Sequence, residues 1–193
     1  MNSICVFCGS NTGFSPKYVE VAQQLGYLFV ERNIRLIYGG GNVGLMGAMA
    51  DAMLERGGRV TGVIPHFLME KEVGHTGLDE QILVDTMHIR KQKMADLSAG
   101  FIAMPGGFGT MDELNEILTW AQLGLHSHPI GILNVNGYYD HLLGMFDKMV
   151  TEGFLRRENR HIVLDSDSSE DLLGQMANYQ APDTTKWLTK GQE

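Results

Sequence analysis

The fold is decided by the stretch RLIYGGGNVGLMG, residues 35–47, in which a short apolar run passes directly into a glycine-rich loop. The run Arg35–Tyr38 has the length and apolar character of a buried strand, and a helix is expected from Leu45 onward. Glycines between a strand and a helix allow a tight turn and let the backbone approach a ligand. This stretch therefore predicts one strand–loop–helix unit of an α/β protein.

The same alternation of short apolar runs and longer amphipathic segments continues along the chain. Further strands are predicted at residues 3–8, 59–64, 81–84, 100–104, 130–135 and 161–164. Helices are predicted at residues 16–31, 45–56, 88–98, 111–125, 138–152 and 169–179. Strands alternating with helices predict an open parallel sheet that helices cover on both faces. We expect one domain over residues 1–181 and a loose tail over residues 182–193.

Composition limits the class of protein. The 193 residues, of which 44% are hydrophobic and 20% charged, suffice for the core of one domain and exclude a disordered chain. Glycine accounts for 24 residues, well above the usual share of roughly 7%, but it has no three-residue period, which excludes a collagen. The net charge of −8 predicts that neither nucleic acid nor an anionic membrane surface is a partner.

The compartment is predicted from the first residues and from the cysteines. Residues 1–10 lack the basic start and apolar stretch of a signal peptide, and no apolar run approaches the roughly 18 residues of a membrane span. Cys5 and Cys8 have the sequence spacing of a C-x-x-C redox motif. In a strand, however, residues i and i+3 point to opposite faces, which favours buried structural thiols in a reducing compartment. We therefore expect a cytoplasmic protein without a redox pair.

Three glycine-containing loops follow predicted strands, and parallel strands bring such loops to one edge of the sheet. They contain Gly9 and Ser10 in the first, Gly40 and Gly41 in the second, and PGGFGT, residues 105–110, in the third. Backbone amides at a helix start form a cradle for phosphate, although glycines in any single loop can also serve only a tight turn. Long glycine loops at one edge favour the phosphate cradle.

The second loop also matches the dinucleotide fingerprint G-x-G-x-x-G at Gly39, Gly41 and Gly44. That fingerprint expects an acidic residue about 20 positions further on, where it binds a ribose. The next strand here ends in VIPH, residues 63–66, without an acid, so an NAD oxidoreductase is disfavoured. Neither glycine loop ends in Gly-Lys-Ser/Thr, which excludes a Walker phosphate loop.

Two groups of charged residues stand near predicted helix starts. MHIRKQK, residues 87–93, puts cations in the first turns of a helix that Asp85 or Thr86 caps, where they oppose the helix dipole unless an anion binds. A solvated basic face is the alternative. Thr110 and Glu113 fit a capping box, whereas a carboxylate beside an anion cradle also suits chemistry on a phosphorylated sugar.

Patterns of other catalytic classes are weak. His126 and His128 stand at a predicted helix end before Pro129 without an acidic cluster, which indicates loop and C-cap contacts rather than a metal site. No G-x-S-x-G motif is present, which argues against a serine hydrolase of the α/β type. We expect neither a metal nor a cofactor.

These residues closely resemble the Lonely Guy family of cytokinin riboside 5′-monophosphate phosphoribohydrolases, long labelled lysine decarboxylases. The family signature P-G-G-x-G-T-x-x-E stands at residues 105–113, and its companion M-H-x-R-K at residues 87–91. An early C-G-S, G-G-G-x-x-G-L-M-G at residues 39–47 and T-W-x-Q-L-G at residues 119–124 are also similar. The resemblance spans roughly residues 3–164. It implies a Rossmann-like homodimer that hydrolyses the N-glycosidic bond of an adenine-type nucleoside 5′-monophosphate without a cofactor, releasing the base and ribose 5-phosphate.

The resemblance also implies roles, position by position. Arg90 and Glu113 look like the catalytic pair. The implied substrate-binding positions are Glu72, where the local match is loose, Lys91, Gly106, Gly107, Phe108, Gly109, Thr110, Met111, Asp112 and Thr119. The glycine-containing loops add Ser10, Gly40 and Gly41 to this set.

A mechanism follows as a hypothesis. Cleavage of a ribosyl bond builds positive charge on the sugar, which the Glu113 carboxylate can stabilise while it activates water. The amides of residues 106–110 would hold the 5′-phosphate with help from Lys91, and Arg90 would orient phosphate or ribose or donate to the departing base. Because a cation near a helix start opposes the dipole, we expect Arg90→Ala to leave stability unchanged or slightly raised.

Two other functions compete with hydrolysis. A nucleotide carrier or sensor with the same cradle would bind AMP and release no adenine. A lysine decarboxylase would need pyridoxal phosphate on a lysine, and few lysines other than Lys91 lie near the predicted loops. The sequence leaves open whether plain AMP or an N6-prenylated derivative is the preferred substrate.

Overall fold

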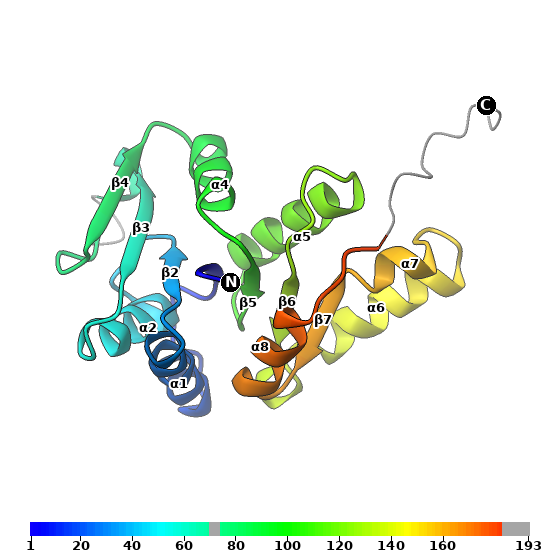
Figure 1. Cartoon of the computed structure of the whole chain (residues 1–193), viewed down its shortest axis with the longest axis horizontal. Helices are drawn as coiled ribbons and strands as arrows, with labels where there is room; N and C mark the ends of the chain where they lie inside the picture. Colours follow the sequence, from blue (N-terminus) through cyan, green and yellow to red (C-terminus); the bar gives the residue numbers. More distant parts are fainter. Residues whose placement is uncertain (70–73, 183–193) are drawn as a thin grey trace.

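All seven strands of the computed structural model, which describes residues 1–69 and 74–182, lie in one parallel sheet of order β4-β3-β2-β1-β5-β6-β7. Figure 1 shows β4 and β7 at its opposite edges. The strands are β1 (Ser3–Phe7), β2 (Arg35–Tyr38), β3 (Val60–Pro65), β4 (Glu80–Val84), β5 (Phe101–Ala103), β6 (Ile130–Leu133) and β7 (Val163–Ser166). The predicted fold class is confirmed.

The strand order reverses at β1, which pairs with β2 through Cys5 and Ile37 and with β5 through Cys5 and Phe101. The chain builds outward from β1 to β4, then crosses back to start β5 on the other side of β1. The loops after β1 and β5 therefore diverge to opposite faces, and this divergence opens a crevice at the carboxyl ends of the two strands. In such folds ligands bind at this position.

Helices cover both faces of the sheet. Buried side chains from α1 (Lys17–Glu31), α2 (Gly44–Leu54) and α8 (Ser169–Ala177) form the core on one face. Those from α4 (Met87–Asp96), α5 (Phe108–Gln122) and α6 (Asp140–Thr151) form the core on the other. The short α3 (His66–Met69), α7 (Arg157–Arg160) and the 3-10 turn η1 (Val135–Gly137) complete the described elements. The one-turn α3 and α7 have no helical period, so sequence reasoning missed both.

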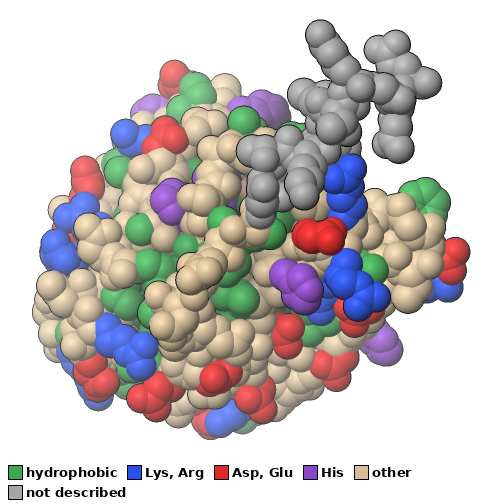
Figure 2. Space-filling view, turned by 45° about the vertical axis from the view of Figure 1, so that its right-hand side comes forward, with side chains coloured by type: hydrophobic (Ala, Val, Ile, Leu, Met, Phe, Trp, Pro, Cys, Tyr) green, Lys and Arg blue, Asp and Glu red, His purple; other side chains and the backbone are tan. Residues whose placement is uncertain are grey.

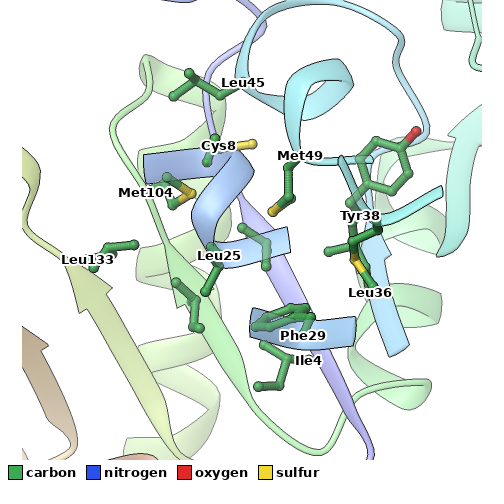
Figure 3. Packing of buried hydrophobic residues seen from close by; sticks show 14 of the residues in the cluster. Ile4, Cys8, Leu25, Phe29, Leu36, Tyr38, Leu45, Met49, Met104 and Leu133 are labelled. Carbon is green, nitrogen blue, oxygen red and sulfur yellow. The ribbon is translucent and has the colours of Figure 1, made fainter. Parts of the chain in front are cut away.

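The two cysteines, one in β1 and one directly after it, belong to the cores on opposite faces of the sheet. Cys5 belongs to the core under α4 and α5, and Cys8 to the core under α1 and α2. Figure 3 shows Cys8 among Leu45, Met49 and Met104. Both thiols are free and buried, and burial raises the pKa of each, which disfavours the reactive thiolate. The prediction of structural thiols is confirmed.

Several element boundaries differ from the predicted ones. Strand β7 begins two residues later than expected, because His161 ends α7 rather than opening the strand. Helix α5 begins three residues earlier, at Phe108, and this difference changes the interpretation of the candidate site. The predicted tail falls outside the described residues from position 183 onward.

The surface mixes charges of both signs. On the face shown in Figure 2, acidic and basic side chains are interspersed around the edge, and apolar side chains gather nearer the middle. Across residues 1–69 and 74–182, every helix is too short or too polar to cross a membrane.

Candidate active site

The three glycine-containing loops meet at the crevice between β1 and β5. The backbone N–H of Gly9 donates to the Pro105 carbonyl at 3.0 Å, and the N–H of Leu45 donates to the Gly9 carbonyl at 3.0 Å. Gly44 has a φ of +62°, and a Cβ there would lie 2.3 Å from the Ser10 carbonyl carbon, so only glycine fits. The predicted convergence of the loops is therefore observed.

A cavity of about 220 Å³ opens at this junction. Glu113 of α5 and Arg90 of α4 line it, and apolar walls come from Met46 and Met94. The structure thus brings together, from different elements, seven of the predicted site residues: Ser10, Arg90, Gly107, Phe108, Gly109, Thr110 and Glu113.

Arg90 is held in a fixed orientation inside the protein. Only 6% of its surface is exposed, its Nε donates to the Val63 carbonyl at 3.0 Å, and its Nη2 donates to the Gly39 carbonyl at 3.0 Å. A Cβ at Gly39 would overlap this guanidinium, so the first glycine of the second loop makes room for Arg90. Two backbone carbonyls at the carboxyl edge of the sheet therefore aim the cation.

The alternative of a solvated basic face is wrong for Arg90, and its buried contacts reverse the expectation for Arg90→Ala, which should now lower stability. Thr86 caps α4, its hydroxyl accepting from the Ile89 N–H at 3.2 Å, while Arg90 lies buried one turn on. Removing its side chain would leave two inner carbonyls without their donors, which costs more than the relief of an unfavourable dipole contact at an exposed site.

Helix α5 begins with an open N-terminus. Gly107 is its N-cap and makes no side-chain cap hydrogen bond, and Thr110 lies buried inside the first turn. The capping-box interpretation of Thr110 and Glu113 is therefore wrong, because Thr110 is not at the cap position. The first amides of α5 remain available to an anion, which the positive end of the helix dipole favours.

The charges of Glu113 and Arg90 both act at the end of β1. Burial is the main cause that raises the pKa of Cys5, and the negative charge of Glu113 raises it further, whereas Arg90 lowers it. Burial and then Glu113 likewise raise the pKa of Cys8. Glu113 is half-buried and lines the same cavity as Cys8 and Arg90, next to the switch point.

Lys91 lies against α5 rather than inside the cavity lining. Its Nζ forms ion pairs with Asp112 at 3.1 Å and Glu116 at 3.0 Å. Burial lowers the pKa of Lys91, but the hydrogen bonds to Glu116 and Asp112 outweigh burial, and the net shift is upward. The pair Lys91 and Asp112 ties α4, and with it Arg90, to the helix that carries Glu113.

The remaining predicted positions are scattered around the cavity. Gly40 and Gly41 are buried beneath residues 74 and 75 and do not line the cavity. Thr119 is exposed further along α5, where its hydroxyl donates to the Asn115 carbonyl at 2.7 Å. Met111 packs on the core and Gly106 lies in the β5–α5 loop. Glu72 lies outside the described residues. Substrate contacts at these positions stay predictions.

Sequence reasoning missed two tyrosines that brace the β5–α5 loop. The hydroxyl of Tyr138 donates to the Gly106 carbonyl at 2.6 Å, and that of Tyr139 donates to the Met104 carbonyl at 2.7 Å. Both follow β6, so their place after a strand end was the signal that could have found them.

Residues 1–69 and 74–182 contain no cluster of three or more His, Cys, Asp or Glu side chains that could hold a metal ion. His126 contacts the Ile117 carbonyl through Nε2 at 3.0 Å, and its Nδ1 accepts from the His128 N–H at 3.2 Å. Both ring nitrogens therefore serve the loop after α5, as predicted.

Comparisons with known proteins agree with this arrangement. A family model described as "Possible lysine decarboxylase" matches residues 46–176. A probable cytokinin riboside 5′-monophosphate phosphoribohydrolase of Oryza sativa subsp. japonica is 49% identical over 91% of this chain and 79% of its own. A cytokinin riboside 5′-monophosphate phosphoribohydrolase of Arabidopsis thaliana is 49% identical over 92% of this chain and 82% of its own.

The similar solved structures support the fold but not the function, because their sequence identities to this chain are low. The Moco carrier protein from Chlamydomonas reinhardtii has a TM-score of 0.69 at 18% identity, covering 91% of this chain and 95% of its own. The molybdenum cofactor binding protein from Rippkaea orientalis has a TM-score of 0.67 at 21% identity with the same coverage of both chains. The loops at the switch point, the buried Arg90 and the relatives at 49% identity lead to one conclusion: the chain belongs to the Lonely Guy family of cytokinin riboside 5′-monophosphate phosphoribohydrolases.

Proposed function

We propose that the protein hydrolyses the N-glycosidic bond of an adenine-type nucleoside 5′-monophosphate, releasing the free base and ribose 5-phosphate. The observation that carries the proposal is one cavity lined by Glu113, Arg90 and the open N-terminus of α5. The similarity to relatives named for this reaction supports it. A carboxylate, a cation and an anion cradle are the groups that such a cleavage needs.

The 5′-phosphate would sit at the start of α5. Gly107, Phe108 and Gly109 line the cavity there, and the cap lacks a side-chain hydrogen bond, so backbone N–H groups face the anion. Gly107 and Gly109 both border open space, because a Cβ at either position would have no heavy atom within 4 Å. The phosphate thus positions the sugar.

With the phosphate at the start of α5, the ribose would lie next to Glu113, one turn further into the helix. Water adds to C1′ as the C1′–N bond breaks, and the departing base takes a proton. The Glu113 carboxylate would accept a proton from the attacking water and stabilise the positive charge on the sugar. Arg90 would donate hydrogen bonds without losing its proton, because guanidinium stays charged in proteins.

Base release tests the proposal directly. We expect chromatography to show adenine or isopentenyladenine released from AMP and from isopentenyladenosine monophosphate, and far less base from adenosine and isopentenyladenosine. The physical reason is that the amides of α5 bind a phosphate that the nucleosides lack. Cleavage of nucleosides as readily as of monophosphates would contradict the phosphate cradle. Binding of AMP without base release would identify a carrier or sensor instead.

We further propose that the protein is a homodimer, as its family resemblance implies. Ile89 on α4 is 48% exposed, and Leu123 and Leu125 at the end of α5 are 57% and 69% exposed. A second copy covering α4 and α5 would bury these apolar side chains. Sedimentation equilibrium is expected to give twice the chain mass of 21.4 kDa, and a mass of one chain at micromolar concentration would contradict the dimer.

We also propose a cytoplasmic location and, besides the second copy of the chain, a small-molecule nucleoside monophosphate as the partner, with neither nucleic acid nor a membrane. The two buried cysteines are free thiols in the cores on opposite faces of the sheet, as a reducing compartment allows. The net charge of −8 disfavours nucleic acid and anionic membranes as partners.

A further inference from the structure

A histidine outside the cavity is locked in one orientation by contacts at both ring nitrogens. The side chain of His75, 8% exposed, places Nε2 2.9 Å from Oδ1 of Asp51 on α2. Its Nδ1 accepts a hydrogen bond from the Gly77 N–H at 3.1 Å. Because Nδ1 is an acceptor, the ring proton is on Nε2, where it donates to the carboxylate.

The backbone beside this histidine covers the second glycine loop. The His75 N–H donates to the Gly40 carbonyl at 3.0 Å, and Gly74 forms an antiparallel bridge with Gly41. Gly40 has a φ of +76°, and glycines sample many backbone conformations unless neighbours restrict them. The segment 74–77 is thus clamped to α2 by its side chain and to the loop by its backbone.

The loop held in this way carries the carbonyl that aims Arg90. Gly39 directly precedes Gly40, and its carbonyl accepts from Arg90 Nη2 at 3.0 Å. A rotation of the Gly39–Gly40 peptide would therefore remove one of the two carbonyls that orient the guanidinium. A displacement of about 1 Å at a catalytic group is enough to slow a reaction roughly 100-fold.

We propose that His75 is a positioning residue of the active site: paired with Asp51, it holds Gly40, and through Gly39 it orients Arg90. Neither His75 nor Asp51 lines the cavity that Arg90 and Glu113 share. The kcat measurements below rest on the proposed function, because base release is what they record. The effect of His75 on the orientation of Arg90 can also be measured by hydrogen exchange, which needs no enzymatic activity.

Two substitutions each break the clamp formed by His75. His75→Gln replaces a ring held at both nitrogens by a flexible amide that cannot serve Asp51 and Gly77 together, whereas Asp51→Ala removes the carboxylate from an exposed helix position that alanine suits. We expect both to lower kcat about 10- to 100-fold with KM changed less than about 3-fold. His141→Gln, at an exposed histidine of α6, is the matched control and is expected to match the wild type.

A double-mutant cycle distinguishes positioning from a general loss of stability. If His75 acts through Arg90, His75→Gln should cost nothing further once Arg90→Lys is present, because the group it orients is gone. If the two substitutions acted independently, their fold losses in kcat would instead multiply in the double variant. All rates are measured at temperatures where circular dichroism shows each variant folded, and Asp51→Ala repeats the cycle where His75→Gln does not fold.

Hydrogen exchange at Arg90 tests the same idea without catalysis. The Nη2 group of Arg90, which donates to Gly39, is followed by nitrogen-15 NMR and assigned with Arg90→Lys. We expect it to exchange at least about tenfold faster in His75→Gln and Asp51→Ala than in the wild type or His141→Gln. Unchanged exchange in both variants, or rate losses that multiply in the cycle, would overturn the proposal. A wild type that releases no base would overturn the proposed function, and the exchange data would still decide this one.

Discussion

Glu113→Gln is expected to lower kcat for base release about 10²- to 10⁴-fold and to leave the protein folded. Glutamine keeps the size and hydrogen-bonding reach of the side chain but cannot take a proton from water or stabilise positive charge on the sugar. Glu113 stands inside α5 rather than in a capping box, so the change removes no cap. Chromatography of adenine released from AMP, beside thermal melts of both proteins, measures the effect.

The matched control is Glu116→Gln on the same helix. Glu116 shares its ion pair to Lys91 with Asp112, so Lys91 keeps one partner, and kcat should stay within about 3-fold of the wild type. A Glu113→Gln enzyme with near wild-type turnover would show that this carboxylate takes no part in the reaction. Equal losses of kcat in both variants would show that the total negative charge on α5 matters, rather than the Glu113 carboxylate in particular.

Arg90→Lys is expected to reduce kcat about 10²- to 10³-fold and also to lower stability. A lysine has one compact ammonium and cannot donate to the Val63 and Gly39 carbonyls in the fixed geometry of a guanidinium. An inner carbonyl left without a donor costs about 1–3 kcal/mol of the free energy of unfolding. Urea unfolding and base-release rates are measured on the same preparations.

Lys93→Gln provides the comparison for Arg90, because it removes a cation from the same helix one turn further on. It should leave turnover unchanged and alter stability by no more than about 0.5 kcal/mol. Should Arg90→Lys lose stability yet keep turnover, Arg90 would be a structural arginine only. Lost turnover without lost stability would mean that the two carbonyl contacts contribute little to folding.

Much of the fold could be predicted from local pattern. The run before Gly39 has the bounds of β2 as observed, because a buried parallel strand is apolar on both faces and glycine ends it. The start of α5 could not be predicted, because Thr110 at the head of an apolar pattern imitates a cap, whereas the chain turns into the helix already at Gly107. The position of a helix cap depends on backbone dihedral angles, which cannot be read from the residue types alone.

Part of the candidate site could likewise be predicted from the sequence, and part could not. The glycine loops and the family signature at residues 105–113 predict Glu113 and an anion cradle at one edge of the sheet, because strand ends in a parallel sheet share one edge. The burial of Arg90 was not predictable, since its two carbonyl partners lie 27 and 51 positions away in the chain. The clamp of His75 on Asp51 is equally remote in sequence, at 24 positions.

The amino-acid sequence is enough to predict the class of fold and the edge at which the loops gather, and its family signature predicts the residues that would cleave a ribosyl bond. Its strand and helix periods and its glycine positions are local, and local steric preference is enough to specify them. That Gly39 makes room for the Arg90 guanidinium rather than for a phosphate is seen only in the folded protein. The tertiary structure also shows that Lys91 pairs with two carboxylates. Such contacts arise when distant strands and helices are packed together, and burial then selects which partner satisfies each charge.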